Sequence, residues 1–121
     1  MVLVLADDEV ASLVDLPSLA PVVEDALVKQ GRGEVERPER PHYDVGTGLD
    51  GPEPLGMGLA MPACVHGEPY FATKLVGVHE GNAEYGLPTI HAQVVLADAR
   101  TGQPVSFMNG GRITNARTGC I

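Results

Sequence analysis

The stretch that decides the fold is Ile90-His91-Ala92-Gln93-Val94-Val95-Leu96-Ala97-Asp98, then Ala99-Arg100-Thr101-Gly102, then Gln103-Pro104-Val105-Ser106-Phe107-Met108. The first and last runs are rich in the β-branched and aromatic residues that favour strands. The four residues between them end in Gly102, which can take the positive φ that a tight turn needs. The stretch therefore predicts an antiparallel β-hairpin.

Further elements are expected on the N-terminal side of this hairpin. Residues 57–65 and 70–78 read as two strands joined by a Gly- and Pro-containing turn, and another strand is expected near residues 40–45. Residues 1–6 are suited to a buried strand, and helices are predicted over 7–14 and 18–30, with Asp7 and Ser18 as N-caps. This order predicts an α+β fold, in which N-terminal helices pack on a mainly antiparallel sheet with a β-hairpin.

The charge balance argues against polyanionic partners. The chain has 16 acidic and 8 basic residues, a net charge of -8, which repels nucleic acid and anionic membranes. No apolar stretch has the length of a membrane span. The first residues lack the basic start of a signal peptide and the two cysteines are far apart, so we expect a reduced, cytoplasmic protein.

Lys74 is the first candidate for a functional side chain. It lies in the middle of an apolar predicted strand, where lysine is a poor strand former. Such a lysine either extends toward solvent or binds an anion such as a carboxylate or a phosphate. The residue type leaves both readings open.

Two arginines are further candidates. Arg40 stands between Pro38 and Pro41, which stiffen the backbone for a guanidinium that grips a carboxylate, although a surface ion pair is the alternative. Arg117 falls in the first turn of a helix that Thr114 would cap, where backbone N–H groups favour anions. The nearby glycines do not form a GxGxxG pattern after a strand, so they are a weak cofactor signal.

Other chemistries find little support. The four histidines and two cysteines do not have the close spacing of a zinc motif, so no metal site is predicted. The sequence also lacks a GxSxG elbow or a recognisable catalytic cysteine signature. We therefore assign no catalytic residue to this chain.

Several stretches together resemble the N-terminal part of the ornithine cyclodeaminase and mu-crystallin family, which also contains archaeal-type alanine dehydrogenases. The matching pieces, in chain order, are Pro38-Glu39-Arg40, Met61-Pro62-Ala63, Thr73-Lys74-Leu75-Val76, Gly81-Asn82, Gly86-Leu87-Pro88-Thr89, Asp98-Ala99-Arg100-Thr101-Gly102-Gln103-Pro104 and Arg112-Ile113-Thr114-Asn115-Ala116-Arg117-Thr118-Gly119. Their order and spacing run along most of the chain.

The resemblance implies roles for individual residues. Arg40 and Lys74 match the family's cations that hold the substrate carboxylate, Arg117 matches an arginine shared by substrate and cofactor, and Thr89 matches a cofactor-contacting threonine. In such enzymes a hydride passes from an amino-acid α-carbon to NAD or NADP, giving an imine that is hydrolysed or attacked by a side-chain amine. The implied partners are an amino-acid or imino-acid substrate and a second copy in a homodimer.

The family continues past the Arg-Thr-Gly motif into a Rossmann domain that binds most of the cofactor, and the 121 residues do not contain it. We therefore expect residues 1–121 to be a substrate-binding and dimerisation domain, truncated at the start of the helix leading to the dinucleotide-binding domain. Such a chain would be inactive alone and would need a downstream Rossmann-containing polypeptide. Alternatives are an alanine dehydrogenase-like member, a non-enzymatic ligand-binding or dimerisation module, or an unrelated α+β binding domain.

Overall fold

The computed structural model of the chain describes residues 2–111 and 113, so Thr114 and Arg117 lie outside the described part. The elements are β1 (Leu3–Leu5), α1 (Asp7–Leu13), α2 (Leu16–Gly31), β2 (Val35–Glu36), β3 (His42–Val45), β4 (Gly56–Val65), β5 (Tyr70–Val78), the 3-10 helix η1 (Glu80–Tyr85), β6 (Ile90–Asp98) and β7 (Pro104–Asn109). No helix in the described ranges is long and apolar enough to cross a membrane.

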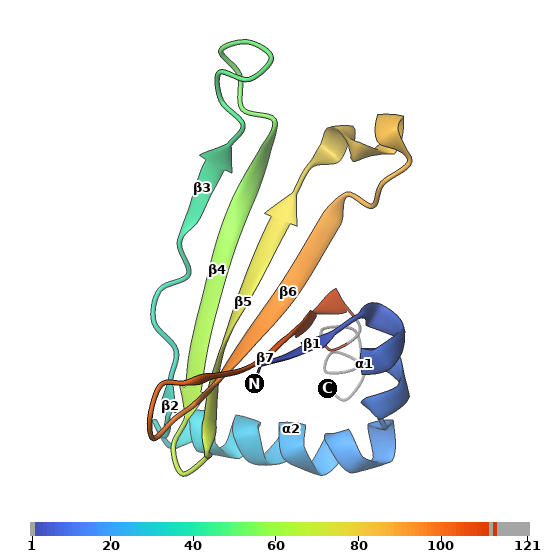
Figure 1. The fold of residues 1–121 in the computed structure, drawn as a ribbon. Helices are drawn as coiled ribbons and strands as arrows, with labels where there is room; N and C mark the ends of the chain where they lie inside the picture. The colour runs from blue at the N-terminus through green and yellow to red at the C-terminus, as the bar shows by residue number, and fades with distance from the viewer. Residues whose placement is uncertain (1, 112, 114–121) are drawn as a thin grey trace.

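One sheet of seven strands organises these elements (Figure 1). The strand order is β1-β7-β6-β5-β4-β2, and β3 also pairs with β4. Every pairing is antiparallel except β1 with β7, which is parallel. The α+β prediction is confirmed, and the described residues contain no parallel strand–helix–strand unit of the Rossmann type.

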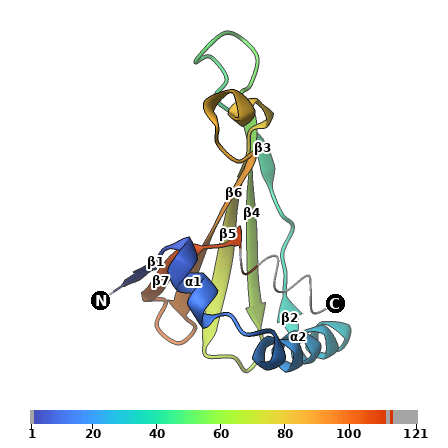
Figure 2. The same ribbon diagram turned by 90° about the vertical axis from the view of Figure 1, so that its right-hand side faces the viewer.

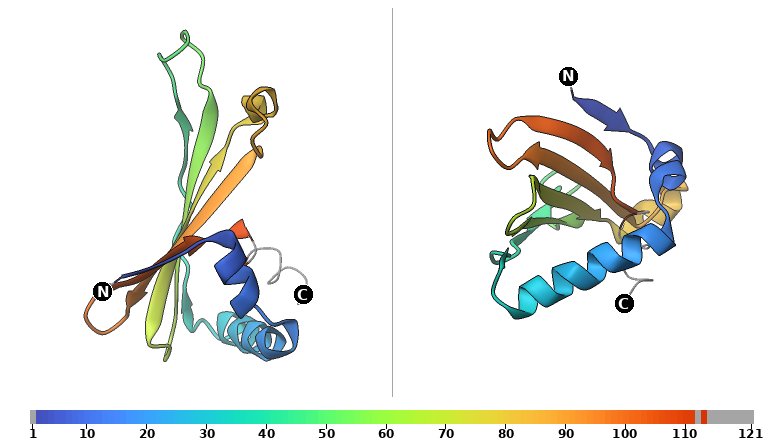
Figure 3. Two further views of the ribbon diagram at one scale, coloured as in Figure 1. Left: turned by 45° about the vertical axis from the view of Figure 1, so that its right-hand side comes forward. Right: turned by 90° about the horizontal axis from the view of Figure 1, so that it is seen from below.

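Both α-helices lie on one side of the sheet, α1 against β7 and α2 against β2 and β4 (Figure 3). The predicted caps were wrong. Helix α1 is preceded by Ala6, whose N–H donates to Glu9 Oε1 at 3.2 Å. Helix α2 begins at Leu16 with Asp15 as its N-cap, because Pro17 fits the first turn, where its missing N–H costs nothing. Pro21 therefore lies inside the helix.

The predicted hairpin is confirmed as β6 and β7. Gly102 has φ 78°, and its N–H donates to the Asp98 carbonyl at 2.8 Å. The Asp98 side chain also organises the turn, because its Oδ1 accepts from the N–H groups of Arg100 (2.7 Å) and Thr101 (3.0 Å). These two bonds, Arg100 first, hold the pKa of Asp98 below its ordinary value.

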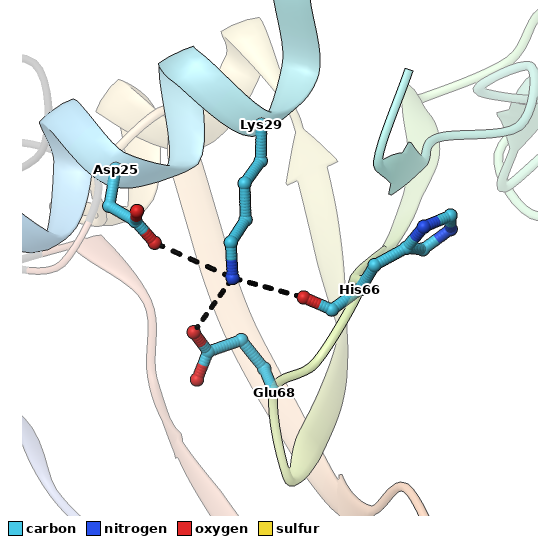
Figure 4. A network of polar contacts seen from close by, with 4 residues as sticks. All are labelled: Asp25, Lys29, His66 and Glu68. Atoms are coloured by element: carbon cyan, nitrogen blue, oxygen red, sulfur yellow. Dashed lines mark hydrogen bonds and ion pairs between the residues drawn. The ribbon is translucent and has the colours of Figure 1, made fainter. Parts of the chain in front are cut away.

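Lys29 connects helix α2 to the turn between β4 and β5 (Figure 4). Its Nζ donates to the His66 carbonyl at 3.0 Å and lies 3.6 Å from the carboxylates of Asp25 and Glu68. Its side chain is 21% exposed, so these contacts are partly shielded from water. This cluster fixes the C-terminal half of α2 beside β4.

The two faces of the sheet differ in what covers them. Because directly paired residues share a face, Met61, Lys74 and Val94 lie on one side, and Thr73, Leu75 and Phe107 lie on the other. We call the first the helix face, because its residues Ala63 and Val65 line a groove together with α2. The second, the open face, exposes large apolar side chains, namely Val4, Tyr43, Phe71, Leu75 and Phe107.

Candidate functional site

Met61 marks the centre of a row of side chains that crosses the helix face. It pairs with Lys74 on β5, which in turn pairs with Val94 on β6. Opposite residues on neighbouring antiparallel strands point to the same side. The half-buried Lys74 side chain therefore belongs to the helix face, beside Met61.

Arg40 continues this row on the other side of Met61. The pairing of β3 with β4, extended by the bond from the Ala60 N–H to the Pro41 carbonyl (3.2 Å), places Arg40 opposite Met61. The side-chain positions are consistent with this backbone placement, since Arg40 Nη1 lies 3.9 Å from Met61 Sδ. Arg40 and Lys74 thus flank one methionine, with two strand spacings, about 10 Å, between their Cα atoms.

The contact with Met61 leaves the guanidinium of Arg40 without a strong acceptor. A thioether sulfur is a weak acceptor, and no ion pair of Arg40 is found within the described part of the chain. Guanidinium groups favour planar, two-oxygen acceptors such as carboxylates. The Arg40 side chain is exposed and can receive such a ligand.

A groove of 340 Å³ adjoins Arg40, between α2 and the edge of the sheet. Figure 2 shows α2 running beside β2 and the adjoining end of β4. Apolar side chains form most of the walls of the groove, among them Ala26 and Leu27 from α2 and Ala63 from β4. The polar residues that line the groove are Gln30, Arg37 and Arg40. A volume of this size suits a small-molecule ligand. A groove with mostly apolar walls and two cations, Arg37 and Arg40, suits a small organic anion.

Arg37 was not among the residues predicted from the sequence. Val35 pairs with Val65, and His42 pairs with Leu59. Val35 and His42 are seven residues apart along the edge of the sheet, whereas their partners on β4 are only six residues apart. The edge of the sheet therefore carries one extra residue, near Pro38. Without this bulge, residues three apart would point to opposite faces.

The pair of prolines around Arg40 was the available signal for this irregularity, because proline cannot donate to a strand ladder and is found at edges and bulges. When the β2 register is continued by one residue, Arg37 is level with Ala63, and when the β3 register is continued by two, Arg40 is level with Met61. Ala63 and Met61 lie on the same face of β4. Both arginines accordingly line the same groove.

The other predicted site residues are not brought to this row. Thr89 immediately precedes β6, five residues before Val94, or roughly 17 Å along the strand direction. Its carbonyl accepts from the His79 N–H at 2.8 Å. Arg117 lies outside the described residues. The described residues therefore place Arg40 and Lys74 together and Thr89 apart from them.

No group of three or more potential metal-binding side chains gathers within the described ranges. Another concavity, of 330 Å³, lies between α1 and α2, where Leu19, Val22 and Ile113 contribute apolar walls and Asp15 is the charged residue. An acidic, apolar pocket is unsuited to a carboxylate. Among these features, the row at Met61 has the chemistry to hold an anionic small molecule.

Comparison with known proteins identifies the family of this chain. The family model described as "Ornithine cyclodeaminase/mu-crystallin family" matches residues 1–121. A Delta(1)-pyrroline-2-carboxylate reductase of Burkholderia multivorans is 34% identical over 113 residues, which is 93% of this chain and 34% of that protein.

Solved structures of relatives have the same fold. An archaeal alanine dehydrogenase dimer with bound NAD superposes with a TM-score of 0.84 at 30% identity, over 98% of this chain and 34% of that one. The Thermococcus litoralis Delta(1)-pyrroline-2-carboxylate reductase, in complex with NADH and L-proline, gives 0.84 at 29% identity, over 98% of this chain and 35% of that one. The chain thus spans about a third of the length of these relatives. It belongs to the ornithine cyclodeaminase/mu-crystallin family.

Proposed function

We propose that this chain forms the substrate-binding part of an NAD(P)-dependent enzyme that oxidises an amino acid to an imine or reduces the imine. Arg40 and Lys74 hold the substrate carboxylate above Met61. The observation that carries the proposal is the placement of both cations on one face, on either side of the same residue.

The two cations act by positioning. A carboxylate fixed by two groups leaves its α-carbon with little rotational freedom, so the hydrogen to be transferred can be aimed at the nicotinamide. When bound, NAD or NADP accepts or donates the hydride. Within the proposal, Arg117 and Thr89 contact the cofactor, as their match to the family suggests, and Arg117 also contacts the substrate.

The relatives favour reduction or oxidation at an amino-acid α-carbon, since their names are those of pyrroline-2-carboxylate reductases and alanine dehydrogenases. Ornithine cyclodeamination is the alternative within the family. We propose that the 121 residues bind substrate but do not turn it over, because most of the dinucleotide would be held by a Rossmann domain, supplied downstream or by another polypeptide. Turnover of proline, alanine or ornithine with NAD by the 121-residue chain would contradict this.

The binding claim can be tested at Met61 itself. The chain has four methionines, so labelling their methyl groups with ¹³C gives a simple NMR spectrum. Addition of L-proline should shift the Met61 methyl signal, whereas L-prolinamide, which lacks the carboxylate, should not. Arg40→Gln and Lys74→Gln should each weaken L-proline binding by about tenfold, because each removes a charged hydrogen bond.

Arg100→Gln is the matched control, since this arginine lies in the β6–β7 turn. It should leave binding unchanged. Equal responses to proline and prolinamide, or insensitivity to both substitutions, would refute the proposed carboxylate site.

The open face supports a homodimer as part of the same proposal. Phe71, Leu75 and Phe107 are each 38–39% exposed, and Val4 is 71% exposed on the neighbouring edge strand. Large apolar side chains exposed on one face of a sheet typically mark a protein interface. Analytical ultracentrifugation should find a dimer that Leu75→Lys dissociates. The control Thr101→Lys introduces the same charge in the exposed β6–β7 turn, outside the open face, and should leave the dimer intact.

A further inference from the structure

The groove beside Arg40 contains a second cation that the carboxylate-holding pair does not use. Arg37 lines the same 340 Å³ groove as Arg40. Neither arginine forms an ion pair with an aspartate or glutamate among the described residues, although the chain carries 16 acidic residues. Two unpaired guanidinium groups that share a groove in a chain of net charge -8 repel each other, unless a ligand lies between them.

The backbone arranges this pair. The extra residue at the sheet edge allows Arg37 to line the same groove as Arg40 and Ala63. The β2 register, continued by one residue, makes Arg37 level with Ala63, two residues along β4 from Met61. The two arginines therefore occupy adjacent rows, separated by about 7 Å along the strand direction. Bulges that redirect a side chain in this way are common beside binding sites.

The part of the groove between Arg40 and Arg37 is apolar and has room for the carbon skeleton of a small ligand. Ala63 from β4 and Ala26 from α2 are short apolar side chains, which leave room above the sheet. A ligand held by Arg40 and Lys74 at its α-carboxylate can extend along β4 over Ala63 and reach Arg37. A ligand that ends in an apolar group would leave the Arg37 guanidinium unpaired.

We infer that the site takes a dicarboxylic amino or imino acid, and that Arg37 binds its second carboxylate. This inference rests on the proposed carboxylate site and names the class of substrate for it. Arg37 is then the specificity-determining residue, whereas Arg40 and Lys74 hold the group that all substrates share.

Paired ligands that differ only in the second acid group test this directly. L-aspartate and L-asparagine have nearly the same shape, as do L-glutamate and L-glutamine. In titrations of the 121-residue chain, followed by the Met61 methyl signal, at least one acid should bind about tenfold more tightly than its amide. Arg37→Gln should abolish this preference and leave the affinity for the amide unchanged, and Arg37→Lys should restore part of it.

The matched controls separate this inference from the proposed function. Arg40→Gln should weaken the acid and the amide alike, and Arg32→Gln, at the C-cap of α2, should change neither. If acids and amides bind equally, or the preference survives Arg37→Gln, the dicarboxylate inference is overturned while the carboxylate site stands. If no α-carboxylate ligand binds, both fail.

Discussion

The guanidinium of Arg40 lies against the sulfur of Met61, with 3.9 Å between Nη1 and Sδ. Met61 pairs on its other side with Lys74, so an uncharged, apolar residue occupies the position between two cations. A carboxylate side chain introduced at residue 61 would therefore lie between the guanidinium of Arg40 and the ammonium group of Lys74. This relationship gives the first prediction.

Met61→Glu should block the site with an internal carboxylate. The new side chain lies within reach of Arg40 and Lys74 and competes with any carboxylate ligand, so L-proline binding should fall by at least about tenfold. Met61→Gln has nearly the same shape without the charge and should bind L-proline more tightly than the glutamate variant. Calorimetric titration measures both. Equal affinity in the two variants would mean that the cations do not meet over residue 61.

Removal of Lys29 should loosen helix α2. Lys29→Met loses the bond to the His66 carbonyl and the contacts with Asp25 and Glu68, and should lower the free energy of unfolding by about 1–2 kcal/mol. Asp25→Asn loses one exposed pair and should cost under about 0.5 kcal/mol. Urea denaturation compares them. If Asp25→Asn is as damaging as Lys29→Met, the carbonyl contact is not the main connection.

Two glycines on β4 should differ in their tolerance of a methyl group. A Cβ at Gly56 would lie 2.5 Å from the His79 ring, and a Cβ at Gly58 would lie 2.8 Å from the Tyr43 ring. Tyr43 is 54% exposed and can swing outward, whereas His79 is half-buried. Gly56→Ala should therefore cost about 1–3 kcal/mol of stability, and Gly58→Ala less.

A second substitution tests the cause. Gly56→Ala combined with His79→Ala should be less destabilised than the sum of the two single variants, because the ring that the new methyl group meets is gone. Thermal melts of the four proteins give the comparison. Strict additivity would place the strain elsewhere.

Acid should weaken the β6–β7 turn through Asp98. Its folded-state pKa is depressed by the N–H groups of Arg100 and Thr101, so the ionised form stabilises the fold above the ordinary pKa of 3.8. That contribution is lost as the pH falls below 3.8 through the depressed value. Asp98→Asn should thus be less stable than the original chain at pH 7, with the difference shrinking toward pH 2. A difference that grows as pH falls would contradict the assignment.

Local sequence patterns predicted most of the sheet. The β6–β7 hairpin and strand β5 were found because their apolar and β-branched runs are bounded by Gly and Pro turns. Strand β2, of two residues, has too little pattern to identify. The parallel pairing of β1 with β7 joins segments about 100 residues apart, and no local pattern encodes such a contact.

The candidate site likewise contains residues that local sequence could predict and one that it could not. Arg40 and Lys74 were identifiable from residue type and context, together with the resemblance to the family. Arg37 was missed because its direction depends on one extra residue at the sheet edge, which is visible only when the partners of β2 and β3 are compared. Residues three apart in a regular strand would have been assigned to opposite faces.

The central claim is that Arg40 and Lys74 bind the same carboxylate, and a double-mutant cycle on L-proline binding tests it most directly. Two cations that bind the same carboxylate are energetically coupled. The binding free energy lost in the Arg40→Gln, Lys74→Gln double variant should therefore be smaller than the sum of the two single losses by about 1 kcal/mol or more. Losses that add to within about 0.3 kcal/mol would show that the two cations act independently, and would contradict the account.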